Sequence, residues 1–248
     1  MTTRGSRNPP PPQDGHWLTD AQVRTFRRGE TIIEAGSPLA EWIAISDGAA
    51  CLAARVAPDT RIAVAALWLG DVIGADSPLG KLAARYDVTA LVDVTTIHLP
   101  LTRVRDRQPA HGGEPGELYA ATATRLQEQI TMRLAGNGLQ RLVSMLATLA
   151  AALGGGPQRR GLANSLALPI SQACIGQLSG LSRRQTWIYL GQLAERGWSR
   201  TARTRVVLEG LNAWLGLMAE VEQRGLACIA TLDDCDATLS RLALTRRG

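Results

Sequence analysis

The sequence predicts an α+β protein with an N-terminal β-roll of the jelly-roll type, one long helix, and a C-terminal helix–turn–helix with a β-hairpin wing. Three observations support this fold class. Short apolar runs separated by turn residues occupy the first hundred residues, and a Gly/Pro-rich connector, "QPAHGGEPG", precedes a long amphipathic stretch. Two serine-led helical segments then flank a glycine near position 180. A chain of 248 residues is long enough to hold two such parts.

The first part of the chain has the pattern of a β protein. Residues 1–16 are polar and contain four consecutive prolines, so we expect a tail without a packed core. Residues 17–112 contain the runs "TIIEA", "EWIAIS", "ACLAARV", "RIAVAALWL" and "TTIHLPL", bounded by Gly, Asp, Ser and Pro. Turn signals recur at a spacing of about 8–12 residues, which is typical of a sandwich or roll.

Residues 113–135 are predicted to form one long helix. Its apolar residues recur at intervals of three to five and form a narrow stripe. A narrow stripe on a long helix suits a coiled-coil seam better than a groove in a large core. We therefore expect a homodimer whose contact residues are Leu118, Ala121, Leu126, Ile130 and Leu134.

Residues 136–216 carry the helix–turn–helix. A first helix, "GLQRLVSMLATLAAAL", stops at "GGGP". Ser171 then caps a short helix that ends at Gly180, and Ser182 caps a second helix that continues to about Glu195. Two helices joined by a short glycine-containing turn have the spacing of a DNA-binding helix–turn–helix. The remaining segment, residues 217–248, is expected to be a helical extension.

The second of these helices has the side chains of a recognition helix at its start. Arg183 and Arg184 can bond guanine O6 and N7, and Gln185 can bond adenine N6 and N7. A recognition helix places its N-terminal residues against base edges in the major groove. We predict these three as the base-reading residues.

A basic hairpin, "WSRTARTRVVLEG", follows and is predicted to be a phosphate-binding wing. Between positions 171 and 205 there are six arginines and one acid, so this segment alone matches the chain's formal charge of +5. The predicted phosphate contacts are Ser171, Ser182, Arg200, Arg203 and Arg205. Double-stranded DNA is therefore the expected partner.

Other classes of function have weaker support. The three histidines are isolated, and no nucleophile elbow, phosphate loop or metal-ligand spacing is found, so we expect neither an enzyme nor a cofactor. The four scattered cysteines, the polar N-terminus and the lack of a long apolar run favour a cytoplasmic protein without a membrane segment. A helical hairpin with a solvated arginine face, and a ligand-binding module that has lost specific DNA binding, remain as alternatives.

The stretch "LPISQACIGQLSGLSRRQTWIYLGQLAERGWSRTARTRVVLEGLNAW" resembles the winged helix of Crp/Fnr transcription regulators. The front segment "FRRGETIIEAGSPLAEWIAISDGAACLAARV", followed by "LWLGDVIG", is similar to the β-roll of that family. The resemblance covers residues 20–215. It implies a homodimer with two recognition helices in successive major grooves on a near-palindromic operator, and RNA polymerase as a further partner.

Two features depart from the family pattern. A second base-reading arginine of many members is replaced by Ile188 here. The cyclic-nucleotide motif is also degraded, because the pocket candidates Gly74, Asp76 and Arg85 are out of register with it. We therefore expect no gating by cyclic AMP, and an effector that is unknown or absent.

The sensing chemistry of other family members has little support in this sequence. The N-terminus lacks the cysteine cluster of the iron–sulfur members, and His98 is interpreted as a structural residue, not a haem ligand. Cys228 and Cys235, seven positions apart, could face the same side of a helix, but we expect them to be buried small residues. Oxidation of Cys174, which could repel phosphate, is a further alternative.

Overall fold

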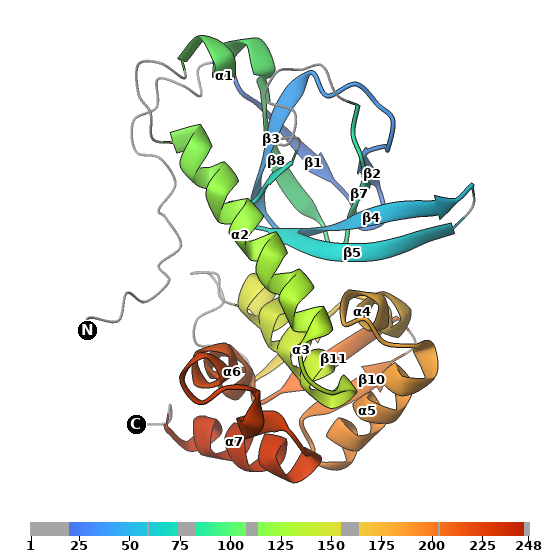
Figure 1. The fold of residues 1–248 in the computed structure, drawn as a ribbon, viewed down its shortest axis with the longest axis vertical. Helices are drawn as coiled ribbons and strands as arrows, with labels where there is room; N and C mark the ends of the chain where they lie inside the picture. The colour runs from blue at the N-terminus through green and yellow to red at the C-terminus, as the bar shows by residue number, and fades with distance from the viewer. Residues whose placement is uncertain are drawn as a thin grey trace.

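The computed structural model describes residues 20–58, 60–73, 83–107, 114–154, 164–202 and 204–245 (Figure 1). The predicted tail, Gly74, Asp76 and Arg203 lie outside these ranges. The β-roll forms one end of the molecule, a long helix runs along it, and the helical C-terminal part forms the other end (Figure 1). The predicted fold class is confirmed.

The β-roll consists of two four-stranded antiparallel sheets. The first has the order β1 (Gln22–Phe26), β8 (Val94–Pro100), β3 (Glu41–Asp47), β6 (Val72–Ile73); the second has the order β2 (Thr31–Ile33), β7 (Asp87–Ala90), β4 (Ala49–Ala57), β5 (Thr60–Trp68). Apolar side chains from both sheets form the core between them, including Ile43, Ile45, Leu67 and Val88. The strand expected over "TTIHLPL" ends at Pro100, and α1 (Leu101–Arg107) begins there, because proline has no N–H to donate to a sheet.

Helix α2 (Glu114–Leu134) is the predicted long helix, and it meets the β-roll through polar side chains. The Thr122 hydroxyl accepts a hydrogen bond from the Val72 N–H at 3.0 Å. Arg125 pairs with Asp71 at 2.7 Å and lies over the ring of Trp68. These residues recur at helical spacing, so they form one polar face of α2 that contacts the β-roll.

The outer edge of β5 is covered by helix side chains. Gln129 bonds both the N–H and the carbonyl of Ala66, at 2.9 and 2.8 Å. Arg133 donates to the Val64 carbonyl at 2.8 Å. The edge strand would otherwise present unpaired backbone groups, and these contacts pair them within the chain.

The C-terminal part begins with α3 (Gly138–Gly154), whose buried face forms the centre of the second core. A three-stranded sheet of order β10 (Ser199–Ala202), β11 (Arg205–Glu209), β9 (Ser165–Leu168) packs beside it. Between β9 and β10 lie α4 (Gln172–Leu178) and α5 (Arg183–Glu195), which are the two predicted helices of the helix–turn–helix. Strand β9 had no counterpart in the sequence prediction.

The chain ends with α6 (Leu211–Arg224), the 3₁₀ turn η2 (Leu226–Ile229) and α7 (Leu232–Thr245). Helix α6 packs against α3, and its fully buried Trp214 donates to the Glu209 carbonyl at 2.9 Å. Cys228 and Cys235 lie on η2 and α7, so the expectation of a shared helix face is wrong, while both are buried as expected. No helix in the described part of the chain combines the length and apolar character needed to span a bilayer.

We predict that Arg125→Ala destabilises the protein by about 3–5 kcal/mol, because it leaves the buried Asp71 carboxylate without its charge partner. Burial already raises the pKa of Asp71, although Arg125 and the Trp68 N–H stabilise its charged form. Urea unfolding measures the difference. The control, Glu128→Ala at an exposed position of α2, should change stability by less than about 0.5 kcal/mol. Equal effects of the two changes would show that the ion pair does not anchor the helix.

Candidate nucleic-acid interface

Serine caps set the start of both helices in the helix–turn–helix, as predicted. The Ser171 hydroxyl accepts from the Cys174 N–H at 3.2 Å. The Ser182 hydroxyl accepts from the Gln185 N–H, and the Gln185 side chain accepts in return from the Ser182 N–H. This capping box pairs two N–H groups at the start of α5 that would otherwise lack partners.

Two glycines determine how α4 meets α5. Gly180 has a φ of +65°, the left-handed conformation that ends α4 and that other residues rarely adopt. A Cβ at Gly176 would lie 2.3 Å from the Thr186 hydroxyl, so the helices cross where one of them has no side chain. Thr186 is itself fully buried. The crossing angle therefore depends on a glycine inside α4.

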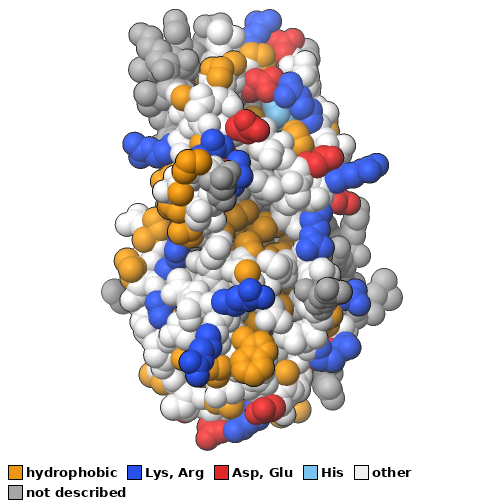
Figure 2. Space-filling view, turned by 90° about the vertical axis from the view of Figure 1, so that its right-hand side faces the viewer, with side chains coloured by type: hydrophobic (Ala, Val, Ile, Leu, Met, Phe, Trp, Pro, Cys, Tyr) orange, Lys and Arg blue, Asp and Glu red, His pale blue; other side chains and the backbone are white. Residues whose placement is uncertain are grey.

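Helix α5 has one buried face and one exposed face, and each contains the residues that the sequence predicts for it. Thr186, Leu190 and Leu193 are buried against the rest of the domain. The basic residues Arg183 and Arg184 are exposed, and the adjoining Trp187 side chain has an exposed fraction of 68%. Figure 2 shows basic and apolar side chains intermixed on the face that carries α4 and α5. The N-terminal end of α5 thus presents cationic and aromatic groups to solvent.

Gln185, predicted as a base reader, is exposed, but its side-chain oxygen is used in the capping box. That oxygen also accepts from the Ser182 hydroxyl at 2.9 Å. A contact from Gln185 to a base through this oxygen would therefore break the cap. Its role as a base reader stays a prediction.

The wing is less basic than its composition suggests. Arg200 pairs with Glu209 across the hairpin, whereas Arg205 is exposed and Arg203 lies outside the described residues. The Thr204 carbonyl at the wing tip accepts a hydrogen bond from Arg28 of the β-roll at 3.3 Å. In this arrangement the wing is in contact with the β-roll.

Helix α7 neutralises a further arginine. Arg196 pairs with Asp233 at 2.6 Å and Asp236 at 3.2 Å, and the Trp198 indole N–H donates to Asp236 at 2.6 Å. Two of the six arginines counted in the sequence are therefore bound to carboxylates. Sequence reasoning missed this contact, although the acidic cluster "LDDCD" at the start of α7 is a visible signal. The helical extension therefore packs against the winged helix–turn–helix.

The arrangement of a β-roll, a long helix and a winged helix–turn–helix is shared with solved structures. A CRP/FNR-family transcriptional regulator from Thermus thermophilus is 17% identical, with a TM-score of 0.60 over 84% of this chain and 98% of that one. FixK2 from Bradyrhizobium japonicum is 20% identical, with a TM-score of 0.61 over 79% and 96% of the two chains. The c-di-GMP-responsive regulator CLP from Xanthomonas campestris is 16% identical, with a TM-score of 0.58 over 78% and 96%.

This chain has the CRP/FNR regulator fold. At these identities the likeness establishes the fold alone. No protein-family model and no curated protein sequence matches the chain.

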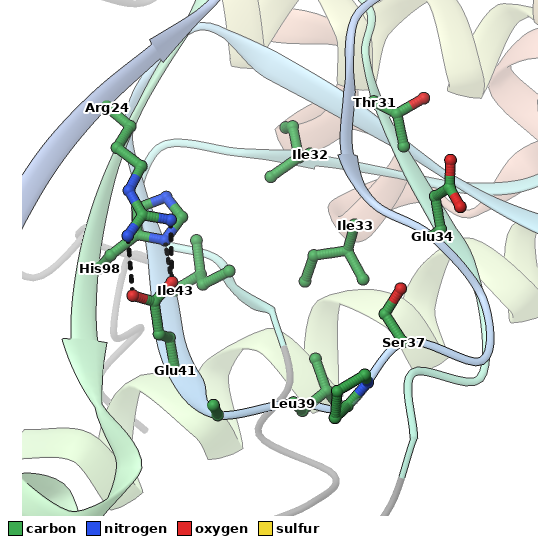
Figure 3. A pocket seen from close by; sticks show the side chains of 12 residues that line it. Arg24, Thr31, Ile32, Ile33, Glu34, Ser37, Leu39, Glu41, Ile43 and His98 are labelled. Atoms are coloured by element: carbon green, nitrogen blue, oxygen red, sulfur yellow. Dashed lines mark hydrogen bonds and ion pairs between the residues drawn. The ribbon is translucent and has the colours of Figure 1, made fainter.

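Only one of the three candidates for the degraded cyclic-nucleotide motif lies among the described residues. Arg85 is exposed, and the other two candidates, Gly74 and Asp76, lie outside the described residues. One cavity formed by described residues of the β-roll has a volume of about 430 Å³ (Figure 3). Arg85 does not line it.

Polar groups on one wall of this cavity are already paired. Glu41 accepts from Arg24 at 2.8 Å and contacts His98 Nδ1 at 2.8 Å (Figure 3). His98 Nε2 lies 2.8 Å from the Thr96 hydroxyl, and burial lowers the pKa of His98. Burial alone would raise the pKa of Glu41, but the contacts with His98 and Arg24 hold it below its usual value. This geometry supports the structural interpretation of His98, and the described residues contain no cluster that could hold a metal ion.

The residues predicted for the dimer contact divide into two groups. Leu118 and Leu126 pack in part against the β-roll of their own chain. Ile130 and Leu134 have exposed fractions of 48% and 80%, and Ala121 is half-buried. The C-terminal half of α2 therefore leaves apolar side chains available to a partner.

We predict that Gly176→Ala destabilises the protein by about 1–3 kcal/mol, because the new methyl group collides with Thr186. Gly191→Ala, on the exposed face of α5 with nothing within 4 Å of the new Cβ, should instead stabilise by about 0.5–1 kcal/mol. Both changes remove the same backbone freedom, so their difference in denaturant unfolding isolates the steric effect. A stabilised Gly176→Ala protein would contradict the close crossing of α4 and α5.

Proposed function

We propose that this protein is a homodimeric, sequence-specific regulator of transcription that binds double-stranded DNA. The observation that carries the proposal is the exposed Arg183–Arg184 pair at the start of a helix whose opposite face is buried and whose N-terminus is rigidly capped. Such a helix can enter the major groove with two guanidinium groups leading. The CRP/FNR fold supports this function, because solved structures with this fold include transcriptional regulators.

The dimer in this proposal forms along α2. Ile130 and Leu134 lie on the part of the helix that the β-roll does not cover, and a second copy would bury them. A two-fold dimer places its recognition helices about 34 Å apart and reads a near-palindromic operator. In the cytoplasm, such a dimer would act through contacts with RNA polymerase.

The proposed regulator is not gated by cyclic AMP. Arg85, the one described residue of the degraded motif, is exposed and does not line the cavity of about 430 Å³ in the β-roll. Any effector of the regulator therefore binds through residues other than the cyclic-nucleotide motif.

A ligand-binding module without specific DNA binding is the second candidate. It is favoured by the exposed Trp187–Ile188 pair, at a place where similar regulators often carry another base-reading arginine.

Ile188 can contact a thymine methyl but cannot donate a hydrogen bond to guanine. We therefore expect an operator that differs from the family consensus.

We predict that duplex affinity falls steeply with salt. Arg183, Arg184 and Arg205 are exposed, and no carboxylate in the described part of the chain pairs with them. With these three arginines from each protomer, the logarithm of the binding constant should fall against the logarithm of salt concentration with a slope of about −5. Fluorescence anisotropy on a selected duplex measures the slope. Absence of salt-sensitive duplex binding would refute the proposal and favour the ligand-binding module.

We predict that Arg183→Ala weakens binding to the selected operator by about 1–3 kcal/mol and relaxes the preference at one base pair in each half-site. Arg103→Ala in α1, an exposed arginine of the β-roll, is the matched control and should leave both affinity and preference unchanged. Binding to randomised duplexes followed by sequencing reports the preference. If Arg183→Ala keeps the wild-type preference, Arg183 does not read a base.

A further inference from the structure

Two cysteines from distant parts of the sequence meet where the β-roll contacts the helix–turn–helix. Cys51 lies on β4 and is buried, with an exposed fraction of 7%. Cys174 lies on α4 and is partly buried. Both belong to one apolar cluster that joins the β-roll to the C-terminal part, and each thiol shifts the pKa of the other, so the two side chains lie close together. The Cys51 thiol donates its own hydrogen bond to the Leu52 carbonyl at 3.5 Å.

This contact makes the two thiols chemically different. The neighbouring Cys51 thiol lowers the pKa of Cys174, because it favours the Cys174 thiolate. The same contact, together with burial, raises the pKa of Cys51. The more accessible sulfur is therefore the one that ionises, and thiolates are the nucleophiles of disulfide exchange.

The surrounding interface consists of small side chains and a few hydrogen bonds. The Ala63 N–H on β5 donates to the Gln177 side chain on α4 at 2.9 Å. Arg28 holds the wing tip through the Thr204 carbonyl. Each of these is a single hydrogen bond that is exposed or only partly buried, so we infer that the helix–turn–helix can move away from the β-roll while the thiols stay reduced.

We propose that Cys51 and Cys174 form a redox modification site, at which a low-molecular-weight disulfide such as oxidised glutathione generates an intramolecular disulfide between the β-roll and the helix–turn–helix. The consequence for regulation rests on the proposed DNA-binding function. With the disulfide formed, α4 stays against the hairpin of β4 and β5, and the wing tip stays against Arg28. The wing is then held away from phosphate groups.

The reaction proceeds by two exchanges. The Cys174 thiolate attacks one sulfur of oxidised glutathione, forms a mixed disulfide and expels a glutathione thiolate. This thiolate takes the proton of Cys51, whose sulfur then attacks the Cys174 sulfur and expels the second glutathione as a thiolate, which takes a proton from water. Two electrons pass from the protein sulfurs to the small disulfide, which leaves as two reduced glutathione molecules.

Peptide mapping of the full-length protein after treatment with oxidised glutathione tests the site. The expected product is a Cys51–Cys174 disulfide in the wild type and in the control Cys228→Ser/Cys235→Ser, which removes the other two thiols. Cys51→Ser should stop at a glutathione adduct on Cys174, and Cys174→Ser should give neither product. A wild-type protein that accumulates the adduct without the disulfide would overturn the proposal.

Amide exchange at Ala63 and duplex affinity test the consequence of the disulfide. Oxidation should slow Ala63 exchange and weaken duplex binding by about tenfold in the wild type and the control, with no slowing in Cys51→Ser. If the disulfide forms but exchange at Ala63 is not slower, the disulfide does not hold α4 against the β-roll. If the affinity for duplex DNA is unchanged by oxidation, the disulfide does not regulate DNA binding. If even the reduced protein binds no duplex, the proposed function fails, whereas the mapping and exchange results still decide the site.

Discussion

The arrangement of the whole chain depends on the open edge of strand β5. An edge strand carries N–H and carbonyl groups that need partners, and leaving them unpaired and buried is costly. Here Gln129 and Arg133 of α2 bond the edge at Ala66 and Val64, and Gln177 of α4 bonds it at Ala63. One strand edge thus fixes both the long helix and the helix–turn–helix against the β-roll. A change at this edge is transmitted to both helices because each supplies a partner to the same backbone.

Helix α2 has one face that contacts the β-roll and one face that is exposed. Its polar face holds the β-roll, most firmly through the buried pair of Arg125 and Asp71. Its remaining apolar residues, Ile130 and Leu134, stay on the surface of the single chain. This division explains why a stripe that is too narrow for a large core can belong to a well-anchored helix. Hydrogen bonds and an ion pair add to the partial packing of Leu118 and Leu126, and Ile130 and Leu134 stay exposed.

Helix α7 extends the winged helix–turn–helix, and acidic side chains make this part of the chain less uniformly basic than its arginine content suggests. Helix α7 brings Asp233 and Asp236 to Arg196 and fixes the indole of Trp198. Glu209 pairs with Arg200 within the wing itself. These carboxylates concentrate the unpaired positive charge at the start of α5, where it can face base edges. The three carboxylates therefore neutralise Arg196 and Arg200, and among the described residues they leave Arg183 and Arg184 as unpaired charges.

The sequence by itself determined the features that arise between neighbouring residues. The caps at Ser171 and Ser182, the turn at Gly180 and the two faces of α5 follow from contacts within four residues, so periodicity and residue type predict them. Tertiary structure alone decided that polar groups of α2 bond the edge of β5, that α7 packs against the winged helix–turn–helix, and that Cys51 and Cys174 share one apolar cluster. Those contacts join residues far apart in the chain, and their partners are backbone groups or side chains whose positions depend on the packing of whole sheets and helices.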